Sequence, residues 1–314
     1  MKLRPGHLVS RRISTLDPVA DAAEIARLSL VTLHGNPSLT YALFTVAFMK
    51  QVAVPTMARI LYRRGGGDIM QFPARRNDDT LLFFGQLLDH GPTSPTGRAW
   101  IARLNQIHAH FPIRNDDSLY TLSTLALDPH RITSDLAHSP FTPTELEAQW
   151  RFWRSVAELQ GLDGLPETRE ALERWARSYE QQEFAPTTEG RAVARSLIEA
   201  FAERVLPQHL RPYADHIISA FCPPNLRQVH DLPHPSRPLQ LATRVAVATY
   251  AGSTPLRLVD LDRSMVSTFG VRQYGERPPS EVGYRRSVRA NPAEVASDDQ
   301  GLSGVRSPQL PRSR

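Results

Sequence analysis

The chain is predicted to be an all-α protein, because apolar residues recur at steps of three and four in many segments. No segment alternates between apolar and polar residues strictly enough, for long enough, to demand a sheet. No linker interrupts the helical patterns before about residue 276, so one multi-helix domain is expected over residues 1–275. Outside the central segment described next, these patterns cover residues 17–33, 37–49, 143–159, 167–179, 189–205, 210–221 and 239–250.

The centre of the chain carries a helix that puts one histidine on an apolar face. The helix is expected to begin after Ser94, whose hydroxyl can cap it, and to end before the next proline. His108 follows Leu104 by four residues and shares the apolar stripe, whereas His110 follows Gln106 by four and faces water. Periodicity alone also fits a core histidine whose hydrogen bonds are satisfied, and that interpretation stays open at this point.

A capped helix is expected on each side of this central one. The preceding helix should start after Asn77 or Asp78, and the following helix should open with residues 115–117. Arg76 lies four residues before Thr80, so both side chains would point the same way if the first helix begins early enough. The pattern suits either ordinary core helices or a pocket with a histidine on one wall and an arginine–threonine pair on another.

The segment RRNDDTLLFFGQLLDHG, followed by GRAWIARLNQIHAHFPIRNDDSLYTLSTLALDP, resembles the signature of the MpaB-type oxygenases. Those enzymes share a catalytic domain with latex clearing protein, a rubber oxygenase. The likeness extends upstream through DPVADAAEIARLS and QVAVPTMARIL, and more weakly downstream to about Arg244. It rests on a spaced R-x-x-x-T, an N-x-x-H and an N-D-D-x-L-Y in this order.

The resemblance implies a globin-like helical core that holds one b-type haem, with His108 as the axial ligand of the iron. It places Arg76 and Thr80 on the oxygen-binding side, and it implies O2-dependent cleavage of a C=C bond in an apolar, isoprenoid-like substrate. The chain departs from the family at Asp79, where the rubber enzyme has a lysine that can cap the iron. No carboxylate upstream of the arginine stands out as a general base. The apolar residues compatible with such a substrate are Phe83, Phe84 and Leu87.

Two other functions stay open. The first is a non-catalytic haem protein, such as a gas or redox sensor or a carrier. The second is a non-haem metal hydrolase that uses His108, His110, Asp116 and Asp117, although side chains two residues apart on a helix diverge by about 200°. The His-Asp dipeptide at residues 230–231 resembles a phosphohydrolase metal motif, but it lies between prolines, where no helix is expected to present it.

Composition limits the partners that the chain can have. Its net charge is +5, but Lys2 and Lys50 are its only lysines. No arginine stripe is interleaved with aromatic residues, so nucleic-acid binding is not expected. The single cysteine, Cys222, excludes an intramolecular disulfide and suits a reducing compartment. Without a C-x-x-C-H motif, covalent haem attachment is excluded as well.

A cytoplasmic location is expected, because no apolar segment follows the positively charged start of the chain to make a signal peptide. The most apolar stretch, residues 37–49, is shorter than the ~20 residues of a membrane span and is better interpreted as a core helix. Peripheral membrane contact to reach an apolar substrate stays open. Residues 276–314 contain few large apolar residues and are expected to form a disordered, low-complexity tail.

Overall fold

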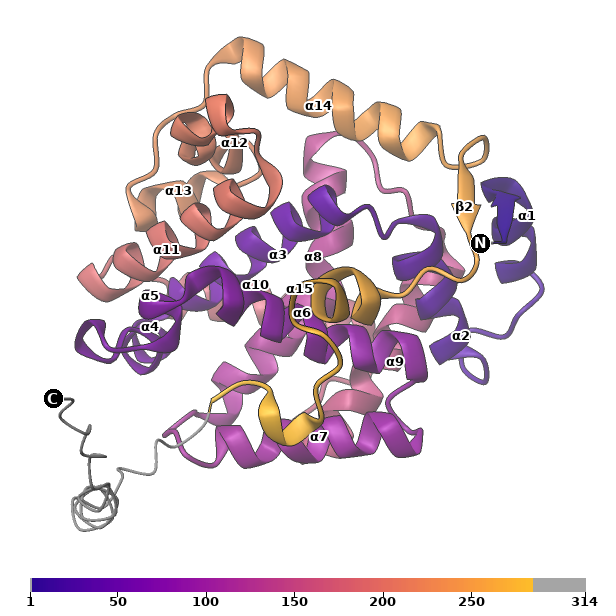
Figure 1. Ribbon diagram of the computed structural model, residues 1–314, viewed down its shortest axis with the longest axis horizontal. Helices are drawn as coiled ribbons and strands as arrows, with labels where there is room; N and C mark the ends of the chain where they lie inside the picture. The colour runs from indigo at the N-terminus through magenta and orange to yellow at the C-terminus, as the bar shows by residue number, and fades with distance from the viewer. Residues whose placement is uncertain (1, 285–314) are drawn as a thin grey trace, which may run out of the picture. The chain divides into compact units, whose positions relative to one another are not determined.

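The computed structural model describes residues 2–284, and within them the protein is all-α, as predicted, with only two short strands (Figure 1). The longer helices are α1 (Gly6–Ile13), α3 (Pro37–Val52), α4 (Pro55–Tyr62), α6 (Pro73–His90), α7 (Pro95–His108), α8 (Asn115–Leu136), α9 (Pro143–Gln160), α10 (Arg169–Glu183), α11 (Thr188–Val205) and α14 (Arg237–Gly252). The shorter elements are α2 (Ala22–Ala26), η1 (Arg27–Leu33), η2 (Arg63–Gly65), α5 (Asp68–Gln71), η3 (Gln208–Tyr213), α12 (Ala214–Ser219), α13 (Pro224–His230), η4 (Ser267–Val271), α15 (Arg272–Tyr274) and η5 (Pro279–Glu281), with strands β1 (Leu3–Pro5) and β2 (Leu258–Asp260).

Helix α3 lies at the centre of the packing. Most of its residues are buried on every face, as expected for a helix that is apolar all round. It packs against α8 and α11, and α11 in turn packs against α4 and α6. The interpretation of residues 37–49 as a core helix is therefore confirmed. None of the helices in the described residues 2–284 is both long enough and apolar enough to span a bilayer.

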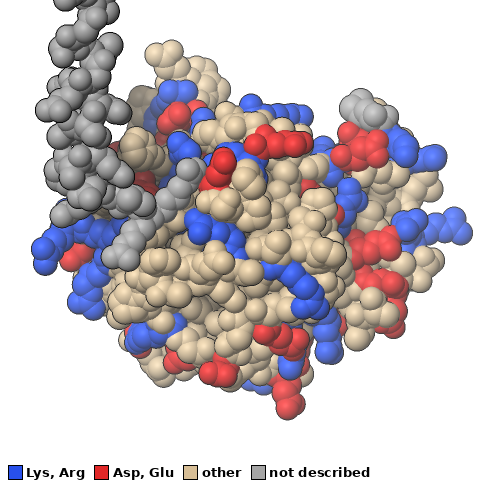
Figure 2. All heavy atoms as spheres, turned by 60° about the horizontal axis from the view of Figure 1, so that its bottom comes forward, with Lys and Arg blue, Asp and Glu red and all other residues tan. Residues whose placement is uncertain are grey.

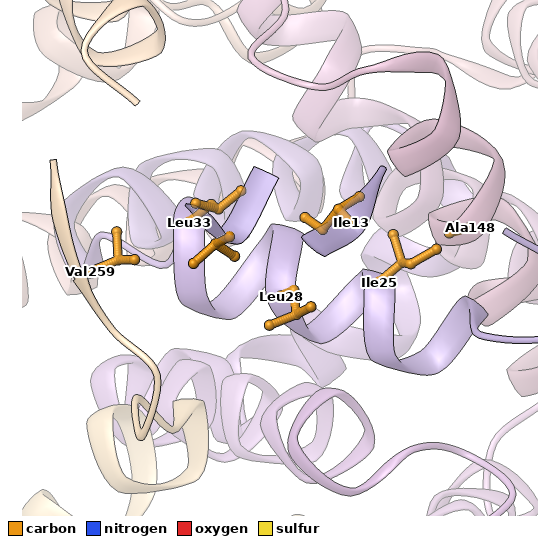
Figure 3. Close-up of a cluster of buried hydrophobic side chains, with 7 residues drawn as sticks. Ile13, Ile25, Leu28, Leu33, Ala148 and Val259 are labelled. Atoms are coloured by element: carbon orange, nitrogen blue, oxygen red, sulfur yellow. The ribbon is translucent and has the colours of Figure 1, made fainter. Parts of the chain in front are cut away.

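The N-terminal helices share a small apolar cluster of their own. Residues 17–33 do not form one α-helix as predicted, because α2 is followed by the π-helical turns of η1. Ile25, Leu28 and Leu33 of these elements are nevertheless buried together, as expected for the apolar face of an amphipathic segment (Figure 3). Val259 of β2 joins this cluster, and β2 pairs antiparallel with β1. The two strands thus fasten the start of the chain to residues that follow α14.

The end of the described chain also packs onto the helical domain. Residues 276–283 were predicted to begin the disordered tail, but Arg277 forms an ion pair with Asp79 of α6 at 2.6 Å. Val282 is fully buried, and η5 lies against α7 (Figure 1). The compact unit accordingly reaches residue 283, beyond the boundary expected at 276. The remainder of the predicted tail, residues 285–314, lies outside the described residues.

Charged side chains are interspersed on the surface. On the face that Figure 2 shows, acidic and basic groups lie next to one another. Several of them form ion pairs one turn apart on a helix, as Arg154 does with Glu158 and Arg177 with Glu173. The expectation that the protein does not bind nucleic acid stays a prediction.

A buried ionic network joins three helices. Lys50 of α3 lies 2.7 Å from Asp128 of α8 and 2.8 Å from Glu180 of α10. Arg131 also contacts Glu180, at 3.1 Å. Burial alone would raise the pKa of Glu180, but Lys50 and Arg131 hold it below its usual value. Asp128 is more deeply buried, and there burial raises the pKa in spite of Lys50 and Arg131. The network places each buried carboxylate beside a cation, which offsets part of the cost of its burial.

Replacing Lys50 with methionine should lower the free energy of unfolding by about 3–5 kcal/mol, because the change leaves buried carboxylates without their cation. Lys2→Met is the matched control, since Lys2 is exposed, and it should change the stability by less than about 0.5 kcal/mol. Urea denaturation followed by circular dichroism would measure both variants. Equal stabilities for the two variants would contradict the structural role given to the network.

Candidate functional site

Arg76 and Thr80 lie on α6, which begins earlier than predicted. The helix starts at Pro73, so Asn77 and Asp78 are buried inside it and do not cap it. Proline suits the first turn of a helix, because its missing N–H would have no partner there in any case. The predicted start after residue 77 or 78 was therefore wrong. The earlier start puts Arg76 and Thr80 one turn apart on the same face.

The two side chains touch each other. Arg76 Nη1 donates a hydrogen bond to Thr80 Oγ1, and the Thr80 hydroxyl donates to the backbone oxygen of Arg76 at 3.0 Å. Both side chains are half-buried. Burial lowers the pKa of Arg76, while the negative charge of Asp79 opposes that shift. A guanidinium stays charged under such conditions, so the pair presents a positive charge and a hydroxyl in a partly dehydrated place.

His108 is the last residue of α7. Ser94 caps this helix as predicted, since its Oγ accepts a hydrogen bond from the Gly97 N–H at 3.0 Å. The His108 ring is half-buried, and burial together with the nearby positive charge of Arg76 lowers its pKa to about 4. The imidazole is therefore neutral at pH 7 and lies near Arg76. Asn105, one turn earlier on α7, donates to the Leu159 carbonyl oxygen at 3.4 Å.

The other members of the alternative metal set point elsewhere. His110 is exposed, and its Nδ1 lies 2.7 Å from the Gln106 carbonyl oxygen of the preceding turn. Asp117 is held by Arg114 at 2.7 Å, and Asp116 is exposed. Within residues 2–284, no group of three or more His, Cys, Asp or Glu side chains is placed to hold a metal ion. The geometry thus does not bring the hydrolase set together.

The structure also explains the position of the His-Asp dipeptide at residues 230–231. His230 ends the short helix α13, contrary to the expectation that no helix would include it. Its ring is buried, and Nε2 lies 2.8 Å from the backbone oxygen of Met49. This histidine is therefore part of the packing between α13 and α3.

Asp79, the departure from the family pattern, is turned toward the C-terminal residues. It accepts hydrogen bonds from Arg277 at 2.6 Å and from the Gly283 N–H at 3.3 Å. Its neighbour Asp78 is bound in the same way by Arg204 at 2.6 Å. Sequence reasoning missed Arg277 because that residue lies in the segment assigned to the tail. The available signal was that two adjacent carboxylates on an otherwise apolar helix need cationic partners.

The aromatic residues of α6 face two different neighbours. Phe83 packs edge-on against Trp100 of α7, with ring centroids 4.9 Å apart. Phe84 packs edge-on against Trp153 of α9 at 5.9 Å and lines a cavity of about 120 Å³. Leu87 is buried. The apolar residues that the sequence suggested for the substrate therefore do not form one surface: Phe83 packs toward α7, and Phe84 lines the cavity.

A comparison with known families identifies the chain. The family described as "ER-bound oxygenase mpaB/B'/Rubber oxygenase, catalytic domain" matches residues 31–251. The chain belongs to this family. Its members are named as oxygenases, and the matched range includes α6, α7 and α8 and therefore Arg76, Thr80 and His108.

Individual relatives of this oxygenase family are distant. The chain is 22% identical to "ER-bound oxygenase mpaB'" of Penicillium brevicompactum over 258 residues, which covers 76% of this chain and 59% of the relative. It is 24% identical to "ER-bound oxygenase mpaB" of Penicillium roqueforti over 164 residues, or 47% and 55% of the two proteins. The chain thus spans less than two thirds of the length of either relative.

One candidate residue was not found from the sequence. His34 follows η1 directly, is 7% exposed, and lines the same cavity as Phe84. Periodicity gave no reason to single it out, because it lies just beyond an expected amphipathic helix. Its local signal would have been a histidine in an apolar stretch with no polar neighbour at helical spacing.

The low pKa of His108 can be tested by NMR on the ligand-free chain. Its ring should stay neutral down to about pH 5 and titrate with a pKa of about 4, against an ordinary value of 6.5. Since the unfolded chain binds this proton first, the contribution of His108 to stability should decrease as the pH falls through 6.5 and level off below 4. A titration of ¹⁵N-labelled histidines, assigned with His108→Asn, would measure it. A midpoint near 6.5 would show that the ring is solvated.

Proposed function

We propose that the protein is a b-type haem-dependent oxygenase that uses O2 to cleave a C=C bond in an apolar, isoprenoid-like substrate. The observation that carries the proposal is that the positive charge of Arg76 on α6 acts on the His108 ring at the end of α7, while the Arg76 side chain is hydrogen-bonded to Thr80. Membership in a family of oxygenases supports the reaction class. The word "rubber" in the family description supports the substrate class.

His108 is the residue that would hold the haem. An axial histidine must be neutral, and burial keeps the His108 ring neutral over the physiological range. No side-chain hydrogen bond from the described residues occupies this ring, so a nitrogen is free to ligate iron. When bound, the haem would supply the activation of O2, while the protein supplies ligation, access and electrostatics.

Arg76 and Thr80 would act on the oxygen side of the site. The fixed positive charge of Arg76 would stabilise negative charge that develops on oxygen, and it is strengthened by partial burial. The Thr80 hydroxyl would orient that oxygen by turning its one proton from the Arg76 carbonyl oxygen toward it, while the hydrogen bond from the Arg76 side chain keeps the hydroxyl oxygen in place. Overall, an alkene and O2 give two carbonyl groups, which balances without an external reductant.

The two carboxylates that directly precede Thr80 on α6 are already engaged. Asp79 is bound by Arg277, and Asp78 is bound by Arg204. Neither is therefore available as a general base while these ion pairs persist. The proposed reaction accordingly relies on the charge and hydrogen bond of the Arg76–Thr80 pair. A non-catalytic haem protein would use the same histidine, and measurements of turnover distinguish the two.

His108→Ala should abolish stable haem binding, whereas His110→Ala should bind about one haem per chain, like the unchanged protein. The reason is that His108 is half-buried near Arg76 and His110 points to solvent. Haem content per chain, determined after acid–organic extraction and with circular dichroism to confirm folding, measures both variants. If His110→Ala were the variant that loses haem, the ligand would be misassigned. A wild-type protein that takes up no added haemin would contradict the proposed cofactor.

Arg76→Ala and Thr80→Ala should each keep haem but lower the rate of O2-dependent alkene cleavage by about 10²–10³-fold, the usual loss on removing one preorganised donor. Arg75→Ala is the matched control, because Arg75 is an exposed arginine on the same helix, and its rate should stay near wild type. Oxygen consumption with an accepted alkene provides the measurement. A haem-loaded wild-type protein without any turnover would favour a sensor or carrier.

A further inference from the structure

A cavity lies between α3, α6, α8 and α9, and its apolar lining includes a buried histidine. Its volume is about 120 Å³, close to the ~150 Å³ engineered apolar cavity in another protein that stays dry and binds benzene. The lining is almost wholly apolar, so the side chains that form it lose dispersion contacts where no ligand fills the space. The side chains that matter below are Leu43, Phe44, Ala47, Phe84, Trp153 and Tyr250.

Asp128 Oδ2 and Trp153 Nε1 of this lining also lack a hydrogen-bond partner within residues 2–284, but the lining residue that lacks partners for both a donor and an acceptor is His34. It is 7% exposed, and neither Nδ1 nor Nε2 has a hydrogen-bond partner within residues 2–284. Its ring is fixed edge-on against Phe141 at 5.0 Å and against Tyr250 at 6.1 Å. Buried imidazoles normally have their hydrogen bonds satisfied. An unpartnered ring held rigidly at a cavity wall is suited to a partner that enters from the cavity.

The charges around the cavity favour a neutral ligand. Burial lowers the pKa of His34 to about 3, so its ring is uncharged and offers one donor and one acceptor. Asp128 also lines the cavity, but Lys50 holds its Oδ1 at 2.7 Å. An anion would meet this carboxylate, and a cation would gain no free counter-charge from the Lys50–Asp128 pair. Arg257 lies over the Tyr250 ring, but it already donates hydrogen bonds to the Tyr250 and Leu33 carbonyl oxygens. An ion of either sign would therefore enter a largely apolar space with little compensation.

We infer that this cavity binds a small neutral apolar group, of about the size of a substituted benzene, that carries one hydroxyl or carbonyl recognised by His34. The inference rests on the proposed function for its role in the reaction. Thr80 and Phe84 are four residues apart on one face of α6, about 6 Å along the helix axis. A substrate whose reacting bond lies beside Thr80 would thus place a neighbouring polar-tipped end in the cavity.

Phenol and toluene test this assignment, because they have nearly the same shape but only phenol can form a hydrogen bond. Calorimetric titration of the full chain should show binding of both. In His34→Phe, the ratio of the phenol to the toluene association constant should fall by about 3- to 10-fold, as expected for the loss of one neutral hydrogen bond. His138→Phe, an exposed histidine, is the matched control and should leave the ratio unchanged.

Ala47→Leu adds bulk to the cavity wall and should abolish binding of both compounds while the variant stays folded by circular dichroism. Failure of the unchanged protein to bind either compound would overturn the site. An unaltered ratio in folded His34→Phe would overturn the role of His34. These titrations need no turnover, so a protein that binds both compounds but no haem would contradict the proposed function alone. A haem-loaded, active protein in which His34→Phe leaves the ratio of the phenol to the toluene association constant unchanged would contradict this inference alone.

Discussion

The candidate site depends on the ion pairs that two adjacent carboxylates of α6 form with arginines from other parts of the chain. Asp78 and Asp79 are 1% and 7% exposed, so each needs a cation close by. Arg204 of α11 reaches the first, and Arg277, near the end of the described chain, reaches the second. These contacts bring segments far apart in the sequence onto one helix. They also fix the rotation of α6 about its axis, because turning the helix would separate both carboxylates from their cations.

That fixed rotation determines what α6 offers to its neighbours. With the two carboxylates committed to α11 and the C-terminal residues, the face that carries Arg76 and Thr80 lies near His108 at the end of α7. The same face continues as Phe84 at the cavity. One face of α6 thus carries polar side chains, Arg76 and Thr80, at one end and the apolar Phe84 at the other. This arrangement is suited to a long, mostly apolar molecule that must be oriented relative to a single reactive point.

The features that sequence predicted are those set by local spacing. Ser94 caps α7 as predicted, and His108 is less exposed than His110, although His110 lies in the turn after the last residue of α7. The missed features depend on partners that are distant in sequence. The start of α6 at Pro73 leaves two carboxylates inside the helix, which is tolerable only because of Arg204 and Arg277. Likewise, Lys50 directly follows the most apolar stretch of the sequence, and its burial is explained only by the carboxylates on α8 and α10.

The position of Lys50 has a consequence for the chemistry of the chain. Lys2 and Lys50 are its only lysines, and the Lys50 side chain is 4% exposed. In the folded protein, an amine-directed acylating reagent would thus meet Lys2 as the one accessible lysine side chain. The Lys50 amine would become reactive only when α3 separates from α8 and α10. Covalent labelling at that single nitrogen would therefore record how often the centre of the molecule opens.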